Sequence, residues 1–552
     1  MKYKILNENY QFSLIERLLQ NRGITHPDSF FHPSFAQLWN DPFLLNDMEK
    51  ATHRIIQWIK KNERIFVFWD YDVDGITASF CLFKFMTKFL NYQNISILYP
   101  DRCKDGYGMK NHHLDLMKEK WATLIITVDN GITSVEEAEY AKQLGLELII
   151  TDHHQILDKI PQAYAVVNQN CSKDYPFKDL AWVWIAFKLI CAMLQKSTFS
   201  TEKKNQIFNY FLPLVTIGSI ADVVPLLDEN RLLVKKGLEL INKWDIPNFL
   251  QGFLDYLQLK WSINSTKIAF NLAPRINAWG RIASPYDSLA LFLHEWNEQI
   301  PYLDHLEKIN TQRKKIQDEW INFAEETLDF SKKILIVAKE DFHEGVIGII
   351  AGKLTEKYNK PSIVFKIDRE RNLATASLRW PDYFSIIDML SAHQTLLERC
   401  WWHKWAWWLT VSLDHFDELC EKLEQYCNEY INDEDLEKEI LIDTKIQASD
   451  WNAENLDFLS LFEPFGEWNS EPTFLFENIE VNHVETFGKS WAGNLKIFWT
   501  WEWHVLQFIF RWKGNQTDLI PNTLSLIGKI EKDTFNGWYL VIWEEIIENS
   551  SL

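Results

Sequence analysis

Residues 68–77 constrain this chain most, because they set three carboxylates where a strand is predicted to end and a helix to begin. The apolar run 65–68 before them is typical of a buried strand, and residues 78–90 after them are apolar at helical spacing. Ligands of open α/β sheets bind at this edge of the sheet. Three acids within five residues repel one another unless cations neutralise them. The pattern indicates either a site for a hard divalent ion or an Asp-rich solvated turn.

Two later strands are predicted to end in polar clusters of the same kind. Residues 123–128 run into Asp129, and residues 146–150 run into the Asp-His-His triplet 152–154. Apolar strands that alternate with helices indicate a parallel sheet covered on both faces, whose strands share one carboxyl edge. The convergence of three clusters at one edge favours the metal site over the solvated turn.

Histidine and a further acid widen the set of donors. Imidazole and carboxylate together suit Mn²⁺. A surface His pair is more often solvated than ligating, so residues 152–154 alone are a weak signal. Asp222 stands in the apolar segment 218–226, where a buried carboxylate needs a partner. A metal would supply that partner, although an Asp in such a place can also cap a helix or loop.

Composition narrows the class of protein. The chain has 552 residues, 47% of them hydrophobic, which suits a globular protein of several domains. No run of 18 apolar residues indicates a membrane span, and the first residues lack the apolar core of a signal peptide. Seven scattered cysteines favour a reduced, cytoplasmic protein without structural zinc. A net charge of −20 argues against a broad surface that coats nucleic acid, but it allows a local basic groove.

Several motifs, taken together, resemble those of a known family. Four blocks resemble the motifs of the DHH phosphoesterases, in the same order: Asp-Tyr-Asp-Val-Asp-Gly (70–75), Asp-Asn-Gly-Ile (129–132), Asp-His-His (152–154) and Ala-Asp-Val-Val-Pro-Leu (221–226). Three more resemble segments of the RecJ-type exonucleases within that family, at 101–108, 273–281 and 342–348. The match runs from about residue 40 to the C-terminus.

The resemblance implies an α/β architecture with a parallel-sheet catalytic domain, a long linking helix, a second α/β domain and a C-terminal β-barrel. The expected divisions are an N-terminal helical segment (1–50), the DHH domain (51–230), a helical connector with the linking helix (231–330), a DHHA1 substrate-binding domain (331–438) and an OB-fold-like domain (439–552). Within these, residues 302–328 are predicted to be one helix and residues 416–438 another. Barrels of this type are common scaffolds for binding single strands.

The resemblance also implies a site with two divalent ions, Mn²⁺ or Mg²⁺, that clamp a phosphodiester. The expected metal ligands are Asp72, Asp74, Asp129, His153 and Asp222. Among the catalytic residues, His154 would contact the phosphate or the leaving group, and Asp70 would orient a ligand. The expected substrate-binding residues are Arg102, Arg275, Asn277, Arg281, His343, Ser377, Arg379 and His403. Of these, Arg102, Ser377 and Arg379 suit a 5′-terminal phosphate, because Arg pairs with phosphate in a bidentate manner.

The implied activity is 5′→3′ removal of nucleotides from single-stranded DNA with a 5′-phosphate, in repair or recombination. The enzyme would act as a monomer beside a helicase and a single-strand-binding protein. A different possibility is a DHH phosphodiesterase for short oligonucleotides or cyclic dinucleotides, although such enzymes resemble the first two domains only. A haloacid-dehalogenase-type phosphatase would give residues 152–154 no role, and the complete set of expected ligands disfavours a non-catalytic replication scaffold.

Tryptophan stands where the family's motifs carry glycine. The chain has 26 Trp and only 19 Gly, although glycine normally makes up about 7% of a protein. The affected positions in the motifs are Trp69, Trp182, Trp184, Trp401, Trp402, Trp408 and Trp468. Such clusters could be a stacking platform for bases. Our interpretation is instead that the gene comes from a lineage that decodes UGA as glycine, and that these UGA codons were translated as Trp in the written sequence.

Overall fold

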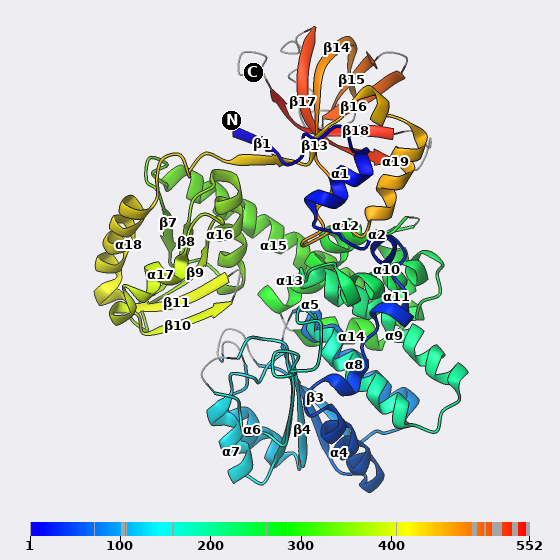
Figure 1. The fold of residues 1–552 in the computed structure, drawn as a ribbon. Helices are drawn as coiled ribbons and strands as arrows, with labels where there is room; N and C mark the ends of the chain where they lie inside the picture. The colour runs from blue at the N-terminus through cyan, green and yellow to red at the C-terminus, as the bar shows by residue number, and fades with distance from the viewer. Residues whose placement is uncertain are drawn as a thin grey trace.

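The structure is a computed structural model in which three regions are arranged around a central group of helices (Figure 1). It describes residues 2–70, 72–100, 105, 108–156, 159–260, 262–283, 285–403, 406–487, 494–501, 504–510, 522–532 and 539–547. Among these residues, no helix combines the length and the apolar character that crossing a membrane would need.

The first region is a five-stranded sheet in the order β3-β2-β4-β5-β6, in which every neighbouring pair is parallel, as the sequence predicts. Its strands are β2 (Ile65–Trp69), β3 (Ile95–Leu98), β4 (Leu124–Val128), β5 (Glu147–Thr151) and β6 (Ala165–Val167). The helices of this region are α4 (Met48–Lys61), α5 (Val73–Lys84), α6 (Asn111–Glu119) and α7 (Val135–Gln143). Strands β2 and β4 are buried along their whole length, because helices cover both faces of the sheet.

A group of helices packs on one side of this sheet and continues its core. They are α8 (Trp182–Lys196), α9 (Thr201–Ala221), α10 (Asp228–Asn242), α11 (Asn248–Tyr256), α12 (Ser265–Lys267), α13 (Ala273–Ile282) and α14 (Pro285–Leu293). Helix α5 packs against both α8 and α9, and Asp74 in its first turn lies against Gly218 near the end of α9. This packing brings two sequence-distant segments of the expected site together.

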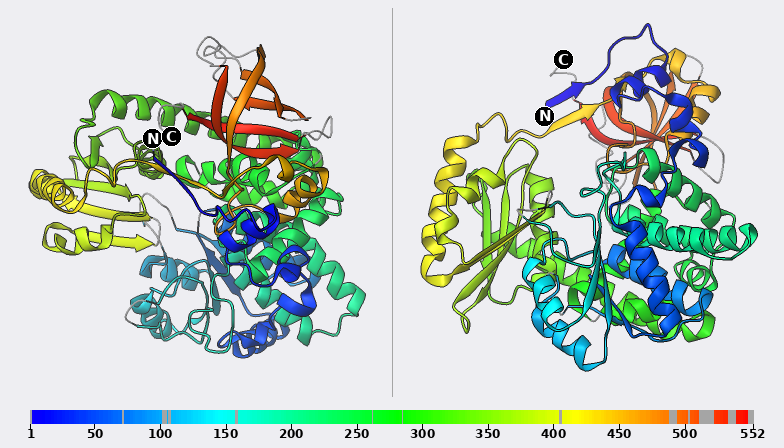
Figure 2. Two further views of the ribbon diagram at one scale, coloured as in Figure 1. Left: turned by 45° about the horizontal axis from the view of Figure 1, so that its top comes forward. Right: turned by 60° about the horizontal axis from the view of Figure 1, so that its bottom comes forward.

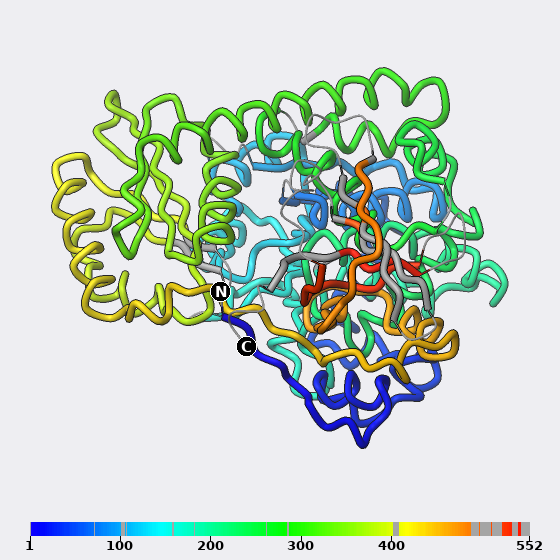
Figure 3. The backbone as a smooth tube through the Cα atoms, turned by 90° about the horizontal axis from the view of Figure 1, so that it is seen from above, coloured from blue at the N-terminus to red at the C-terminus, as the bar shows by residue number. Residues whose placement is uncertain are grey.

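Helix α15 (Ile300–Thr327) joins these helices to the second lobe and runs along one edge of the molecule (Figure 3). The sequence predicts a single helix here, and the structure confirms it within two residues at each end. The second lobe holds a mixed sheet in the order β10-β11-β9-β8-β7. This lobe and the region of the parallel sheet both lie below the barrel (Figure 2). Its elements are β7 (Leu335–Lys339), α16 (Glu344–Tyr358), β8 (Ser362–Asp368), β9 (Leu373–Arg379), α17 (Ile386–Ser391), β10 (Arg399–His403), β11 (Ala406–Ser412) and α18 (Phe416–Tyr430).

The C-terminal strands close on themselves, because β14 pairs with both β15 and β17 in a sheet ordered β13-β14-β15-β16-β18-β17. This is the β-barrel that the sequence predicts. Its elements are β13 (Thr444–Lys445), α19 (Ala453–Leu459), β14 (Phe474–Phe487), β15 (Asn494–Trp501), β16 (His504–Phe510), β17 (Thr523–Lys532) and β18 (Tyr539–Ile547).

The N-terminal segment differs from the helical one expected, because it begins with a strand. Strand β1 (Lys2–Ile5) pairs in parallel with β12 (Glu439–Ile442). Helices α1 (Leu14–Asn21) and α2 (Pro27–Phe31) then share an apolar core with the barrel, and α3 (Phe35–Leu38) follows them. A buried ion pair of 2.6 Å between Arg17 and Asp450 fixes α1 to this region. The first residues therefore complete the C-terminal module.

Two further expectations are corrected in detail. The helix expected over 416–438 ends at Tyr430, and the residues after it up to β12 are not helical. Residues 499–503, in which Trp alternates with other residues, are predicted from the sequence to form a turn between strands, whereas β15 continues through Trp501 and pairs Trp501 with His504 of β16.

Candidate active site

Three carboxylates meet at the carboxyl edge of the parallel sheet. Asp70 and Asp72 follow β2, Asp129 follows β4, and their ligand atoms lie within 4.8 Å of one another. Asp129 is fully buried and Asp70 is 5% exposed. From the sequence, Asp70 is expected only to orient a ligand, whereas the structure places it in the same group as two expected metal ligands.

Local backbone features explain why these side chains converge. Asp72 is the N-cap of α5, and its carboxylate accepts the Gly75 N–H at 2.8 Å. A Cβ at Gly75 would lie 2.5 Å from the Asp70 carbonyl oxygen and 3.1 Å from Asp129 Oδ2. Only glycine therefore lets the first turn of α5 approach the ends of both strands. Asp129 itself has φ of 66°, a conformation that Asp tolerates better than most residues.

Asp74 and Asp222 extend the acidic group toward the helices. Asp74 is buried in the first turn of α5, and the Val183 N–H at the start of α8 donates to its two oxygens at 3.2 and 3.3 Å. Gly218 in α9 makes room for this carboxylate, because a Cβ there would lie 2.5 Å from Asp74 Oδ1. Asp222 caps the end of the same helix. Asp222 therefore has the capping role that the sequence allowed, and it also lies near the other acids.

The electrostatics of the group show a deficit of positive charge. Burial raises the pKa of Asp129 well above its usual value, and the nearby Asp72, Asp70, Asp74 and Asp152 raise it further. Burial followed by Asp74 and Asp72 does the same to the pKa of Asp222. A carboxylate cluster of this kind ionises fully only when cations are bound.

The two histidines of the Asp-His-His triplet have fixed orientations. The Nδ1–H of His153 donates to the Leu180 carbonyl oxygen at 2.6 Å, which makes Nε2 the nitrogen with a lone pair for a metal. His154 Nδ1 lies 2.8 Å from Asp152 Oδ1, and Asp152 also accepts backbone N–H groups of Ile132, His153 and His154. Burial opposes ionisation of Asp152, but His154 and these donors outweigh it and lower its pKa.

This donor set fits a hard divalent cation. Buried carboxylates supply the oxygen ligands that Mg²⁺ and Mn²⁺ prefer, and an oriented imidazole adds a ligand suited to Mn²⁺. The mutual repulsion of the acids is the structural sign that such a cation belongs there.

Three expected substrate-binding residues lie on α13, beside the carboxylates. The Oδ1 atom of Asn277 accepts the Val73 N–H at 3.1 Å, which ties α13 to the start of α5. Arg281 donates to the Gly345 carbonyl oxygen at 3.1 Å and so connects α13 to the second lobe. Arg275 differs, because Glu307 on α15 pairs with its guanidinium at 2.7 Å. A charge neutralised in this way is a weaker partner for phosphate than the sequence suggests.

The second lobe brings three more expected residues together near the start of α16. His343 is the N-cap of α16, and its Nδ1 accepts the Gly345 N–H at 3.1 Å. On β9, Arg379 donates to Ser377 Oγ at 3.1 Å. Gly348 of α16 lies against this pair, since a Cβ there would be 3.1 Å from Ser377 Oγ and 3.3 Å from Arg379 Nη2.

The side chains of two expected substrate-binding residues lie outside the described part of the chain. His403 ends β10, where it pairs with Ala406 of β11, and its side chain lies outside the described part. Arg102 lies outside the described residues altogether.

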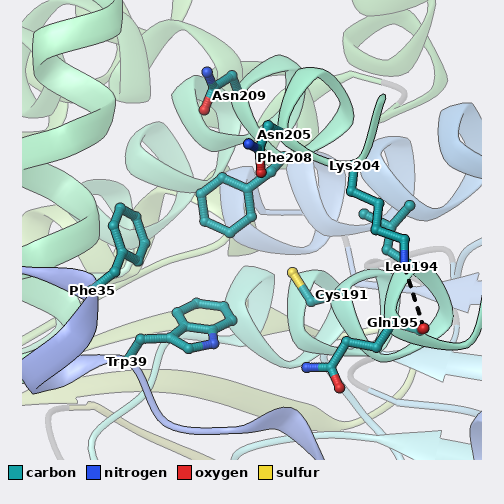
Figure 4. A pocket seen from close by; sticks show the side chains of 9 residues that line it. All are labelled: Phe35, Trp39, Cys191, Leu194, Gln195, Lys204, Asn205, Phe208 and Asn209. Atoms are coloured by element: carbon teal, nitrogen blue, oxygen red, sulfur yellow. Dashed lines mark hydrogen bonds between the residues drawn. The ribbon is translucent and has the colours of Figure 1, made fainter. Parts of the chain in front are cut away.

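A separate pocket lies elsewhere and takes no part in this site (Figure 4). It measures about 430 Å³ and is formed by α3, α8 and α9. Aromatic side chains of Phe35, Trp39 and Phe208 line it, together with the buried thiol of Cys191. It contains none of the acids described above.

Sequence reasoning missed residues whose role depends on packing. Gly218 and Leu180 position a carboxylate and a histidine, but neither carries a chemical signature in the sequence. Arg313 on α15 lines a small pocket together with Asn277 and Arg281. The only sequence signal for it is its place on the predicted linking helix.

Comparisons with known proteins agree with this architecture. The family model described as "DHH family, N-terminal domain" matches residues 64–219, and the model described as "RecJ OB domain" matches residues 442–539. The single-stranded-DNA-specific exonuclease RecJ of Bacillus subtilis (strain 168) is 32% identical over an alignment of 553 positions, which covers 97% of this chain and 68% of that protein.

Solved structures show the same fold. The crystal structure of RecJ in complex with Mn²⁺ from Thermus thermophilus matches with a TM-score of 0.81 at 22% identity, covering 97% of this chain and 76% of that one. A crystal structure described as exonuclease RecJ bound to manganese matches with a TM-score of 0.60 at 25% identity, covering 70% of this chain and 96% of that one. With the identity to the Bacillus relative, these matches lead to one conclusion. The chain belongs to the RecJ family of single-stranded-DNA-specific exonucleases.

Proposed function

We propose that this chain is a metal-dependent exonuclease that hydrolyses phosphodiester bonds of single-stranded DNA from the 5′ end. The buried carboxylate group at the sheet edge carries the proposal, because it needs cations and lies in a chain that is 32% identical to a single-stranded-DNA-specific exonuclease. Mn²⁺ is the favoured ion, since relatives were solved with Mn²⁺ and the site offers imidazole beside carboxylate. Mg²⁺ is the second choice.

Asp72, Asp74, Asp129, His153 and Asp222 are the ligands that we assign to two such ions. When bound, the ions would neutralise the scissile phosphate and lower the pKa of an attacking water. Asp70 adds a sixth donor or orients a neighbouring ligand. His154, which Asp152 holds at 2.8 Å, would contact the phosphate or the leaving group.

The second lobe would hold the strand by its phosphates. Arg379 and Ser377 suit the 5′-terminal phosphate, because a guanidinium and a hydroxyl both donate and Arg pairs with phosphate in a bidentate manner. Arg281 links α13 to α16 and so connects the Arg379 and Ser377 pair to the carboxylates. Arg102, Asn277, His343 and His403 are further contacts in the proposal, and Arg275 is the weakest because Glu307 neutralises it.

The cellular setting of the proposal is DNA repair or recombination in the cytoplasm. A monomer of this kind would work beside a helicase that opens duplex and a single-strand-binding protein that covers the product strand. The C-terminal barrel supports a polymeric substrate, because barrels of this type bind single strands. For the same reason it argues against short oligonucleotides or cyclic dinucleotides as the main substrates.

A single degradation assay tests the proposal. The purified chain is incubated with Mn²⁺ and a single-stranded or duplex DNA that carries a 5′-phosphate or a 5′-hydroxyl. We expect mononucleotides released from the 5′ end of the phosphorylated single strand, and no release in EDTA. Equal cleavage of duplex, or a preference for a dinucleotide or cyclic dinucleotide, would contradict it. Asp129→Ala is the matched inactive control.

A further inference from the structure

Arg313 lies in the linking helix α15 and lines a small pocket beside the carboxylates. The pocket measures about 190 Å³, and its wall includes Asn277, Arg281 and the residues on either side of Asp222, Ala221 and Val223. Neither an Asp nor a Glu side chain lines it among the described residues. The two guanidinium groups in its wall favour an anion, and Arg281 also acts on the nearby Asp72.

The Arg313 side chain is deeply buried, and Asp318 is a counter-charge that acts on it only from beyond ion-pair distance. The residue is 6% exposed, and its Nε atom has no hydrogen-bond partner in the described part of the chain. No carboxylate of the described residues comes within ion-pair distance of it, whereas Arg275 on α13 is paired with Glu307. A buried charge is normally paired, so the missing partner points to a ligand.

Two neighbours on the same helix hold the guanidinium in place. Its Nη1 donates to Gln317 Oε1 at 2.9 Å, and its Nη2 donates to Asn310 Oδ1 at 2.8 Å. These bonds use two of the five N–H groups of the guanidinium, so the rest remain for a ligand. Burial lowers the pKa of Arg313, which an anion in the pocket would reverse. Such an oriented fork suits a tetrahedral oxyanion.

We propose that this pocket is a phosphate subsite in which Arg313 and Arg281 hold a backbone phosphate of the DNA strand next to the metal centre. The identity of the anion rests on the proposed nuclease function. Arg313 is a positioning residue here: it fixes the strand relative to the carboxylates. Because it stands on the helix that joins the two lobes, it also sets the strand between them.

DNA binding without hydrolysis tests this subsite. Anisotropy of a labelled 5′-phosphorylated single strand is measured in EDTA at several salt concentrations. We expect Arg313→Gln to weaken binding by about tenfold or more and to reduce the slope of log affinity against log salt by about 1. The control Lys315→Gln removes the same charge from the exposed side of α15 and leaves both values unchanged. Binding by Arg313→Gln that equals binding by Lys315→Gln would overturn the proposal.

A second variant and probe keep the test decisive if Arg313→Gln fails to fold. Arg313→Lys keeps the charge but loses the fork, so we expect intermediate affinity with an unchanged salt slope. Wild-type affinity in Arg313→Lys would overturn the proposal. Inorganic phosphate should raise the thermal midpoint of the wild type, raise that of Arg313→Lys less, and leave that of Arg313→Gln unchanged. Failure of the nuclease assay with these binding results intact would refute the proposed function and leave the anion subsite standing.

Independently, the backbone at several tryptophans has the conformation that favours glycine. Trp121 and Trp244 follow α6 and α10 with φ of 64° and 57°. Each donates its N–H three residues back, and the next residue donates five residues back, which is the Schellman motif. Gly23 and Gly145 occupy the same motif with φ of 61° and 67°. A bulky residue in this conformation is an outlier.

Trp468 stands in a tight turn with the same requirement. Gly466 and Asn469 exchange hydrogen bonds of 3.0 and 3.1 Å across the two residues between them. Trp468 is the second of these and has φ of 61°, as at the glycine position of a type II turn. Its side chain is 63% exposed, so burial of the indole does not compensate for the strained backbone.

Trp69 and Trp184, two buried tryptophans at glycine positions of the family's motifs, lack a partner for the indole N–H, as does the buried Trp279 on α13. Trp69 and Trp184 are fully buried, and neither Nε1 has a hydrogen-bond partner in the described part of the chain. Trp58, by contrast, donates to Thr123 Oγ1 at 3.0 Å. Buried Trp normally satisfies this group. Trp58 therefore has the environment of a true tryptophan, and Trp69 and Trp184 do not.

We infer that glycine occupies positions 69, 121, 184, 244 and 468 in the protein that its native cell makes, because that cell reads UGA as glycine. The backbone of Trp121 and Trp244 adds positions outside the family's motifs, so the inference does not depend on the resemblance. The excess of Trp over Gly, 26 to 19, has the same origin.

The gene and the native protein decide this point. UGA codons at these positions, with glycine in the peptides seen by mass spectrometry of protein from the native cell, are expected. UGG codons or Trp-containing peptides would overturn the inference. In a recombinant chain carrying Trp, the triple change Trp121→Gly, Trp244→Gly and Trp468→Gly should raise the thermal midpoint, whereas Trp58→Gly should lower it. A lower midpoint in the triple variant would also count against it.

Discussion

Replacing Asp129 with Asn should stabilise the metal-free protein while it removes activity. Asp129 is fully buried, and two other carboxylates lie with their oxygens within 4.8 Å. At that distance and an effective dielectric constant of about 20, two ionised carboxylates repel by about 3 kcal/mol. Protonation of one carboxylate removes this repulsion. For a carboxyl of ordinary pKa, protonation costs about 1.4 kcal/mol for each pH unit above the pKa, or roughly 4 kcal/mol at pH 7. We therefore expect Asp129→Asn to raise the free energy of unfolding by about 3 kcal/mol at pH 7 in EDTA.

The pH dependence follows from the raised pKa of Asp129. A carboxyl whose pKa is higher in the folded protein than in the unfolded chain stabilises the fold most at pH values below its unfolded pKa. That stability is lost as the pH rises from about 4 through the raised folded value. The difference between variant and wild type should therefore be smallest near a pH of about 4 and grow toward neutral pH.

Bound metal should reduce or reverse the difference in the free energy of unfolding between Asp129→Asn and the wild type. At a Mn²⁺ concentration about 100 times its dissociation constant, the wild type gains about 2.7 kcal/mol, and the variant, which lacks one ligand, gains much less. Chemical denaturation in EDTA and in Mn²⁺ measures both effects, with Glu136→Gln on α7 as control. An Asp129→Asn variant that is less stable than the wild type in EDTA would refute the reasoning.

Three other predictions concern the site. His153→Ala should lose nuclease activity by about 100-fold or more with an unchanged circular-dichroism spectrum, and near wild-type turnover would remove it from the ligands. Gly218→Ala should weaken Mn²⁺ binding in a metal titration, because its Cβ would lie 2.5 Å from Asp74 Oδ1; Gly352→Ala, with 4.0 Å to its nearest neighbour, should not. Arg379→Ala should slow degradation of 5′-phosphorylated ends more than of 5′-hydroxyl ends, and equal slowing in kinetic assays would exclude a role at the terminal phosphate.

The parallel sheet and its acidic edge could be predicted from the sequence, because local signals determine them. The strand before Asp70 is a continuous apolar run, and the helix after it begins where the Asp72 side chain can cap it. Strand ends that carry Asp129 and residues 152–154 must share an edge once the strands are parallel. The ligand types, and hence the class of metal, follow from the same residues.

The tertiary structure decided which side chains complete that edge, because long-range packing positions them. Arg275 and Arg313 have the same chemistry in the sequence, yet packing gives Arg275 an acid partner at ion-pair distance on α15 and buries Arg313 without one. Gly218 shows its role only when α9 lies against Asp74. The N-terminal strand joined the C-terminal module rather than a helical segment, because its pairing partner β12 stands at residues 439–442, far along the chain. Local sequence sets which groups are present at the site, whereas contacts between distant segments set which of them are neutralised and which face the substrate.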